Sequence, residues 1–143
     1  MKRAIAALAL LAASTTLALA EGKHHKVAIH VDQNDPAVLN MALNNVQNLA
    51  SYYKSQGDPL DVEVGAYGPG LAMYTADSPV KDRISQMHME LDNVAFAACG
   101  NTLAGMEKKA GKKIDLLPEA SVVPSGVVRL TELQEDGYTY IRP

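Results

Sequence analysis

The chain contains a single cysteine, Cys99, in the sequence surroundings of a reactive thiol. It follows the apolar run at residues 93–98 and directly precedes Gly100, Asn101 and Thr102. An apolar run of this kind is typical of a buried strand, and a helix is expected to begin directly after it. The unpaired N–H groups at a helix N-terminus stabilise a thiolate, which is the nucleophilic form of cysteine. The pattern therefore predicts a nucleophile whose pKa lies below the value of roughly 8.5 for free cysteine.

The neighbours of Cys99 extend this chemistry. Gly100 lets the backbone approach a ligand closely, and Asn101 or Thr102 is expected to cap the helix and to hydrogen-bond a substrate. No Lys, Arg or His adjoins Cys99 in the sequence, so any cation that lowers its pKa further must come from elsewhere in the fold. His30 is the first candidate for that cation, although a histidine inside a strand is more often a core residue. A buried structural thiol is the alternative interpretation of Cys99.

Strands and helices alternate along the chain, and this order predicts the fold. Short apolar or β-branched runs mark the strands, at residues 26–31, 60–66, 93–98, 120–123 and, as an edge strand, 138–141. Apolar spacing and capping residues mark helices at residues 36–53, 79–89 and 125–135, a further helix that follows the segment 99–102 and continues through Ala110, and a short helical turn at 71–74. Ser78 is expected to cap the helix at 79–89. The alternation predicts a single α/β domain, doubly wound, with a mostly parallel five-stranded sheet and helices on both faces.

The carboxyl ends of parallel strands meet at one edge of a sheet, and ligands bind there. The segments at this edge are residues 32–35, 67–70, 99–102 and 124–126, so the cysteine lies among them. We expect polar residues at this edge to orient the substrate that reacts with Cys99. The candidate substrate-binding residues are Gly100, Asn101, Thr102, Asp32, Asn34, Tyr67, Pro124 and Ser125.

The first twenty residues have the three-part order of a secretory signal peptide. Lys2 and Arg3 precede an apolar run at residues 4–19, and Ala18 and Ala20 provide the small residues of a cleavage site. Residues 1–20 are therefore predicted to be a cleaved signal peptide and residues 21–143 the folded domain. The predicted location is the periplasm, with no membrane association after cleavage because no later segment is long and apolar enough to span a bilayer.

Composition narrows the classes of function. Without Lys2 and Arg3, 11 basic residues remain against 16 acidic ones, a formal charge of −5, so no basic surface for nucleic acid is expected. One cysteine cannot form an intramolecular disulfide.

Metal and cofactor motifs are weak in this sequence. The metal candidates are the neighbouring His24 and His25 and the run at residues 87–90, and we expect neither a metal nor a cofactor. The chain has no G-x-G-x-x-G, P-loop or G-x-S-x-G motif.

Three segments of the chain resemble the DsrE/DsrF-like family: residues 26–31, the run Asn-Val-Ala-Phe-Ala-Ala-Cys-Gly-Asn-Thr at 93–102, and residues 123–138. The resemblance extends over nearly all of residues 21–143. It implies a flavodoxin-like α/β fold, assembly into trimers or hexamers, and sulfur carried as a persulfide on a cysteine after the third strand. The matching residue is Cys99. The best understood relatives are cytoplasmic, whereas this chain carries an export signal.

Two classes of function follow. The first is a sulfur-relay protein, similar to a sulfurtransferase, which holds sulfane sulfur on Cys99 and passes it to a partner thiol. Its donor and acceptor, proteins or small thiols, are not identified by the sequence. The alternative is a non-catalytic oligomeric module of the same fold that binds a small ligand or senses redox state.

The helix at residues 36–53 carries no charged residue, and its polar side is rich in amides. Exposed helix faces usually carry Lys and Glu, whereas charged residues are depleted at the core of an interface. We therefore expect this helix to contact another subunit of a homo-oligomer, although a monomeric surface rich in amides is the alternative. Substitution of Asn44 or Asn48 by Glu is expected to weaken assembly.

Overall fold

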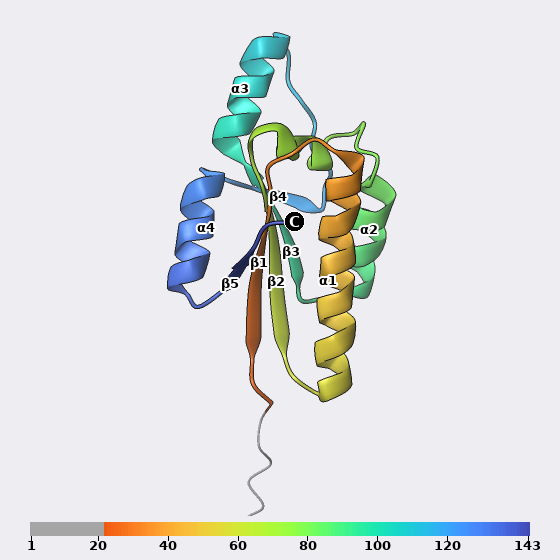
Figure 1. The fold of residues 1–143 in the computed structure, drawn as a ribbon. Coiled ribbons are helices and arrows are strands. Elements are labelled where there is room, and N and C mark those ends of the chain that lie inside the picture. The colour runs from red at the N-terminus through yellow and green to blue at the C-terminus, as the bar shows by residue number, and fades with distance from the viewer. Residues whose placement is uncertain (1–21) are drawn as a thin grey trace, which may run out of the picture.

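The computed structural model describes residues 22–143, which fold around one five-stranded sheet (Figure 1). The predicted signal peptide lies outside the described residues. The strands, in chain order, are β1 (His25–Val31), β2 (Leu60–Ala66), β3 (Val94–Cys99), β4 (Ala120–Val123) and β5 (Thr139–Ile141). Their order across the sheet is β4-β3-β2-β1-β5, and every neighbouring pair is parallel. The predicted parallel sheet and its edge strand are confirmed.

Four α-helices and one 3₁₀ helix connect these strands. They are α1 (Pro36–Gln56), η1 (Gly68–Tyr74), α2 (Lys81–Glu90), α3 (Gly100–Ala110) and α4 (Gly126–Glu135). Asp35 caps α1 through a side-chain bond to the N–H of Ala37, and Pro36 occupies its first turn, where a missing N–H costs nothing. Gly57 ends α1 at a φ of 75°, a left-handed conformation that favours glycine.

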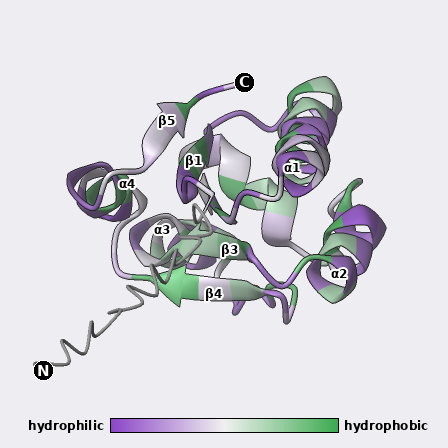
Figure 2. Ribbon diagram, turned by 90° about the horizontal axis from the view of Figure 1, so that it is seen from below, coloured by the Kyte–Doolittle hydropathy of each residue, from purple (hydrophilic) through white to green (hydrophobic). Residues whose placement is uncertain are grey.

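The two faces of the sheet are covered by different helices because of the direction in which the chain moves. From β1 to β3 each connection steps the same way across the sheet, so α1 and α2 lie on one face (Figure 1). From β4 to β5 the chain crosses back over the sheet, and α4 lies on the opposite face, as the end-on view shows (Figure 2). The fold is therefore doubly wound and flavodoxin-like, with the order of strands reversing between β1 and β5.

Alternation along the strands divides the side chains between these faces. Val27, Ile29 and Val31 of β1 enter the main core beneath α1 and α2, together with Val64 and Phe96. The intervening residues face α4, where Ala28 forms a smaller cluster with Leu130 and Leu133. Because Cys99 alternates with Phe96 and Ala98 along β3, its side chain lies on the α4 side.

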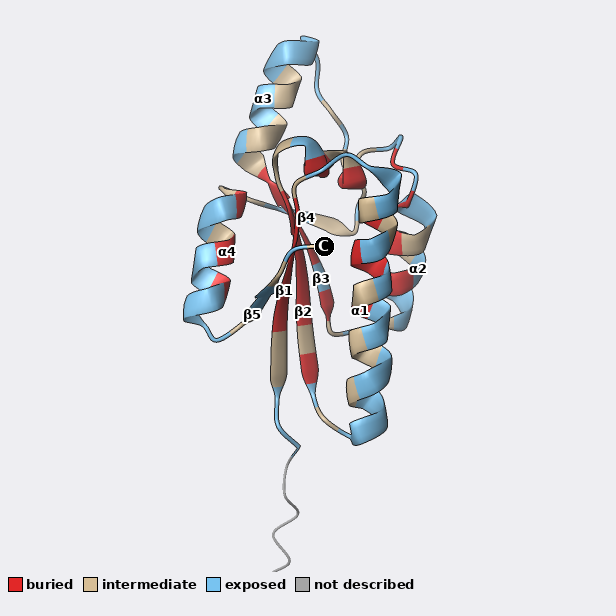
Figure 3. Cartoon of the chain, in the orientation of Figure 1, coloured by how far each residue is buried: buried red, intermediate tan, exposed pale blue. Residues whose placement is uncertain are grey.

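Helix α3 does not cover either face. It has no buried residue and projects beyond the carboxyl ends of the strands (Figure 3). It starts directly from the last residue of β3, so its N-terminus is fixed at the strand edge while its body extends into solvent. No helix within residues 22–143 is long and apolar enough to cross a membrane.

The predicted start of the second helix was wrong by two residues. Helix α2 begins at Lys81 with Val80 as its N-cap, and no side chain caps it. Ser78 is buried and accepts a hydrogen bond from the N–H of Val80 at 3.3 Å instead. Its hydroxyl therefore closes the turn before the helix.

Candidate functional site

Cys99 is both the last residue of β3 and the N-cap of α3. Its Sγ accepts a hydrogen bond from the backbone N–H of Thr102 at 3.4 Å. The prediction that Asn101 or Thr102 caps this helix was wrong, because the strand passes into the helix without an intervening loop and leaves the capping position to Cys99. The thiol therefore occupies the place that Ser or Asp usually takes at a helix N-terminus.

A second helix N-terminus reaches the same sulfur. Helix α4 begins at Gly126, and the N–H of Asn101 donates to the carbonyl of Pro124 at 3.2 Å, which joins the two helix starts. Burial raises the pKa of the Cys99 thiol. Hydrogen bonds from the Thr102 hydroxyl and from the backbone N–H groups of Gly126, Thr102 and Asn101 outweigh it, so the pKa of Cys99 lies below its ordinary value. The thiolate therefore forms at lower pH than in free cysteine, the direction predicted from the sequence.

The two helix starts can approach Cys99 because glycines occupy them. A Cβ atom added at Gly126 would lie 2.9 Å from the Cβ and Cδ1 atoms of Tyr67 and 3.1 Å from the Cβ of Cys99. A Cβ atom added at Gly100 would lie 3.0 Å from the carbonyl oxygen of Val123. All of these distances are shorter than ordinary van der Waals contact. Cys99 itself is only 4% exposed, so its sulfur is enclosed by these turns.

The Thr102 hydroxyl is held in place from the other side. Its Oγ1 accepts a hydrogen bond from the N–H of Gly68 at 2.9 Å. Gly68 opens η1, directly after β2, so the segments that follow β2 and β3 are connected through this hydroxyl. Because Gly68 donates to the oxygen, the hydroxyl hydrogen is free to point at the sulfur of Cys99.

An aromatic cluster lies beside the thiol, on the same side of the sheet. The ring of Tyr67 packs on the ring of His30 with centroids 4.4 Å apart, and His30 Nδ1 lies 2.7 Å from the hydroxyl oxygen of Tyr140. The Nε2 atom of His30 is buried and has no hydrogen-bond partner. These contacts fix Tyr67 between His30 on one side and Gly126 on the other.

His30 does not act as the expected cation. Burial lowers its pKa, against an opposing effect of Asp32, and the residue is 4% exposed. Its ring contacts are with Tyr67 and Tyr140, and it is not among the causes of the pKa shift of Cys99. Hydrogen bonds from backbone and hydroxyl groups take the role that a cation was expected to play.

The structure brings together some of the predicted site residues and separates others. Gly100, Asn101, Thr102, Tyr67, Pro124 and Ser125 surround Cys99 or adjoin residues that touch it. Asp32 instead pairs with Arg142 at 2.9 Å. Asn34 lines a cavity of about 400 Å³ between η1 and α3, which it shares with Pro69, Met106 and Thr102. Neither Asp32 nor Asn34 has a contact with the sulfur among the described interactions.

The described residues contain no group of three or more His, Cys, Asp or Glu side chains that could hold a metal ion. Two neighbouring histidines, His24 just before β1 and His25 at its start, each face one carboxylate. His24 Nε2 lies 2.8 Å from Asp61, and His25 Nε2 lies 3.3 Å from Asp58. Both pairs join the start of β1 to the start of β2, so they tie the first strand to the second.

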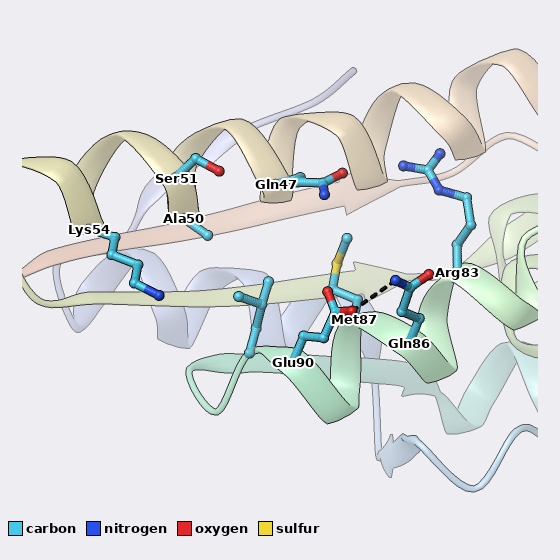
Figure 4. Close-up of a pocket in the computed structure, with 9 residues that line it drawn as sticks. Gln47, Ala50, Ser51, Lys54, Arg83, Gln86, Met87 and Glu90 are labelled. Carbon is cyan, nitrogen blue, oxygen red and sulfur yellow. Dashed lines mark hydrogen bonds between the residues drawn. The ribbon is translucent and has the colours of Figure 1, made fainter.

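A cavity of about 340 Å³ between α1 and α2 lies apart from this site (Figure 4). It is on the face of the sheet opposite the Cys99 side chain and contains none of the predicted site residues. Lys54 and Glu90 enter it from opposite helices, and Gln86 donates to Glu90 at 2.8 Å. Arg83 extends from α2 toward Asn40 and Asn44 of α1, whose side-chain oxygens accept its hydrogen bonds. No cysteine lines this cavity.

A solved structure from Methanobacterium thermoautotrophicum is similar to the chain over almost its whole described length. That protein, MTH1491, is a protein of unknown function, and it is 32% identical in sequence with a TM-score of 0.70. The match covers 83% of this chain and 99% of MTH1491. This chain belongs to the same family as MTH1491. No family model matches the chain, and no curated protein matches it.

Three residues at the carboxyl edge of the sheet in this MTH1491 relative had no role in the predicted site. Gly126 was assigned to a helix without a role, and Tyr140 and Arg142 lie in or beyond the short edge strand. The reversal of strand order places β5 beside β1, which brings Tyr140 to His30 and Arg142 to Asp32. A sequence signal existed for Gly126, because a glycine that follows Pro124 and Ser125 at a helix start is typical of a close backbone approach.

Proposed function

We propose that this protein carries sulfane sulfur as a persulfide on Cys99 and passes it to a partner thiol. The Cys99 thiolate attacks the outer sulfur of a donor, a new S–S bond forms at Sγ, and the donor's own S–S bond breaks as its leaving group takes the electron pair. A thiolate of the acceptor then attacks the outer sulfur of the Cys99 persulfide and regenerates Cys99. Both steps are sulfur transfers between thiolates and sulfane sulfur and need no separate oxidant.

One observation carries this proposal: the starts of α3 and α4 converge on a single sulfur. The N–H groups of Asn101, Thr102 and Gly126 and the hydroxyl of Thr102 lower the pKa of the thiol. The same donors are suited to the negative charge of a persulfide, whose outer sulfur is ionised near neutral pH. A thiol that only fills space in a core has no use for such donors.

The family resemblance and the predicted location belong to the same proposal. We assign the chain to the DsrE/DsrF-like proteins on residues 26–31, 93–102 and 123–138, and MTH1491, being of unknown function, adds support for the fold alone. From the leader-like residues 1–20 we also propose that the protein is exported to the periplasm.

Intact mass measurement tests the carrier function. After incubation with inorganic polysulfide, the native protein is expected to gain about 32 Da, the mass of one sulfur atom added by thiol–disulfide chemistry. Cys99→Ser, which keeps a hydrogen-bonding group at the N-cap, is expected to gain nothing. Dithiothreitol should remove the added mass and release sulfide.

Two outcomes would contradict the carrier function. One is a native protein that gains no sulfur although its thiol reacts with iodoacetamide while folded. The other is a thiol that reacts only after denaturation, which the 4% exposure of Cys99 would then explain. In the first case the ligand-binding or redox-sensing module is the better description, and in the second case the ligand-binding module is.

We also propose that the protein is a homo-oligomer, a trimer or hexamer, with α1 at a contact. Met41, Asn45, Asn48 and Tyr52 follow one another at helical spacing, and Met41 and Tyr52 are 46% and 60% exposed. The structure also accounts for part of the amide-rich surface, because Asn40 and Asn44 accept hydrogen bonds from Arg83. Asn48 belongs to the exposed stripe, whereas Asn44 faces Arg83.

Asn48→Glu is therefore expected to weaken assembly, because a charge at the contact would lose its water. Asn44→Glu is the matched control, since a new carboxylate there faces Arg83 and adds no unpaired charge. Light scattering at micromolar concentration measures both variants and the native protein. A monomeric native protein, or equal behaviour of the two variants, would contradict this contact.

A further inference from the structure

Tyr67 borders the enclosure of Cys99, and its position suggests a role that the sulfur chemistry itself does not use. A Cβ atom added at Gly126 would lie within 2.9 Å of two atoms of Tyr67 and within 3.1 Å of the Cys99 Cβ. Tyr67 and Cys99 therefore both lie directly against Gly126. Cys99 is 4% exposed, so little space is left between these groups for a reagent.

The Tyr67 ring is held rather than free to rotate away. It packs on His30, and it contacts the apolar cluster of Ala28, Leu130 and Leu133. Its backbone is also fixed, since its N–H donates to the carbonyl of Val31 at 3.2 Å and its own carbonyl accepts from Gly70 at the same distance. A side chain fixed at both ends forms a wall that excludes bulky groups.

The electrostatic surroundings of the Cys99 sulfur favour a negatively charged reagent. The N–H groups and the positive dipole ends of α3 and α4 converge on Cys99. No carboxylate is among the causes that shift the pKa of Cys99, and none of the described ion pairs includes Cys99 or a residue adjacent to it. An anionic donor is therefore favoured over a neutral one.

We propose that Tyr67 is a specificity-determining residue that restricts the sulfur donor of Cys99 to small inorganic sulfane-sulfur anions such as polysulfide. This inference rests on the proposed carrier function. With hydrogen disulfide, the Cys99 thiolate attacks the outer sulfur, the S–S bond of the donor breaks, and hydrosulfide leaves with the electron pair. Glutathione persulfide would react by the same step and release glutathione thiolate, but its peptide body must pass Tyr67.

The test compares a small and a large reagent on each variant, so that the ratio of the two rates reports access alone. The sulfur reagents are inorganic polysulfide and glutathione persulfide, followed by intact mass. The alkylating reagents are iodoacetamide and fluorescein maleimide. Tyr67→Ala is expected to raise the large-to-small ratio by about tenfold with both pairs, the factor given by removing ~1.4 kcal/mol from a barrier. Tyr67→Phe, which keeps the aromatic ring, should have the same large-to-small ratio as the native protein.

Tyr138→Ala is the matched control, because Tyr138 contacts the same apolar cluster but lies at the opposite end of α4 from Gly126. It should leave the ratio at its native value. Tyr67→Leu, which retains apolar packing without the ring, replaces Tyr67→Ala if the latter fails to fold. An unchanged ratio in Tyr67→Ala and Tyr67→Leu, or an equal rise in Tyr138→Ala, would overturn the role of Tyr67.

The two pairs of reagents separate this inference from the carrier function. If the alkylation ratio rises in Tyr67→Ala while no variant gains sulfur, then Tyr67 controls access and the carrier function is wrong. If the native protein takes sulfur from both donors at equal rates, the carrier function stands and the restriction to small donors is wrong.

Discussion

Replacing Arg129 by methionine should lower the free energy of unfolding by about 2–4 kcal/mol, because it leaves a carboxylate buried without a partner. Glu63 lies in the middle of the sheet, on β2, and is 7% exposed. Arg129 of α4 binds it through two parallel hydrogen bonds, at 2.7 Å from Nε and 2.6 Å from an Nη atom. About a third of the Arg129 side chain is exposed, which keeps the expected loss below that of a fully buried pair.

Urea unfolding of three proteins measures this effect. In the double variant Glu63→Met/Arg129→Met both charges are replaced by apolar side chains, so it should recover most of the stability that Arg129→Met loses. Glu132→Ala is the matched surface control, since Glu132 lies 3.8 Å from Arg129 and is 55% exposed, and it should change the stability by less than about 0.5 kcal/mol. A loss in Arg129→Met as small as that of Glu132→Ala would mean that water reaches Glu63.

This ion pair also illustrates which parts of the fold the sequence could predict. The five strands and the start of α1 at residue 36 were predicted from local patterns, because runs of β-branched residues and the signals of a helix start act within a few residues. The pairing of Glu63 with Arg129 joins positions 66 residues apart. An alternating strand such as 60–66 shows that Glu63 faces away from the main core, but not that α4 crosses over it.

The candidate site divides in the same way. Cys99 and its neighbours were predicted because strand, nucleophile and helix start are contiguous in the sequence. The partners of Asp32 and His30 were not, since they come from the last strand, and the sequence does not show that β5 returns to the edge beside β1. The local signal placed all polar residues of the carboxyl edge in one site, and the observed strand order separates Asp32 with Arg142 from Cys99.

Gly70 connects the stability of this edge to the chemistry of Cys99. A Cβ atom at position 70 would collide with the carbonyl oxygen of Val31, and it would lie 2.6 Å from the carbonyl carbon of Val31 and 2.8 Å from the nitrogen of Asp32. All three are backbone atoms, which cannot rotate away as a side chain does. Gly70→Ala must therefore push η1 away from the end of β1, at an expected cost of about 3 kcal/mol, the upper end of the usual range for overpacking.

The displacement should also change the thiol. Gly68, two residues earlier, donates to Thr102 Oγ1 at 2.9 Å, and Thr102 in turn stabilises the Cys99 thiolate through its hydroxyl. If η1 moves outward, that hydroxyl loses the contact that orients it. A thiolate with fewer hydrogen-bond donors is less stable relative to the thiol, so the pKa of Cys99 rises from its lowered value. The pH dependence of iodoacetamide alkylation should then have its midpoint at higher pH in Gly70→Ala than in the native protein.

Gly105→Ala provides the matched control, because an added Cβ there meets no atom within 4 Å and the position lies within α3. It should raise the free energy of unfolding by up to about 1 kcal/mol, since alanine favours a helix over glycine, and leave the alkylation midpoint unchanged. Alkylation of both variants is measured at a temperature below the onset of their unfolding, so that only folded protein contributes to the pH profile. A Gly70→Ala protein that is destabilised but keeps the native midpoint would show that Thr102 stays in place without Gly68, and that the thiolate depends on the helix N–H groups alone.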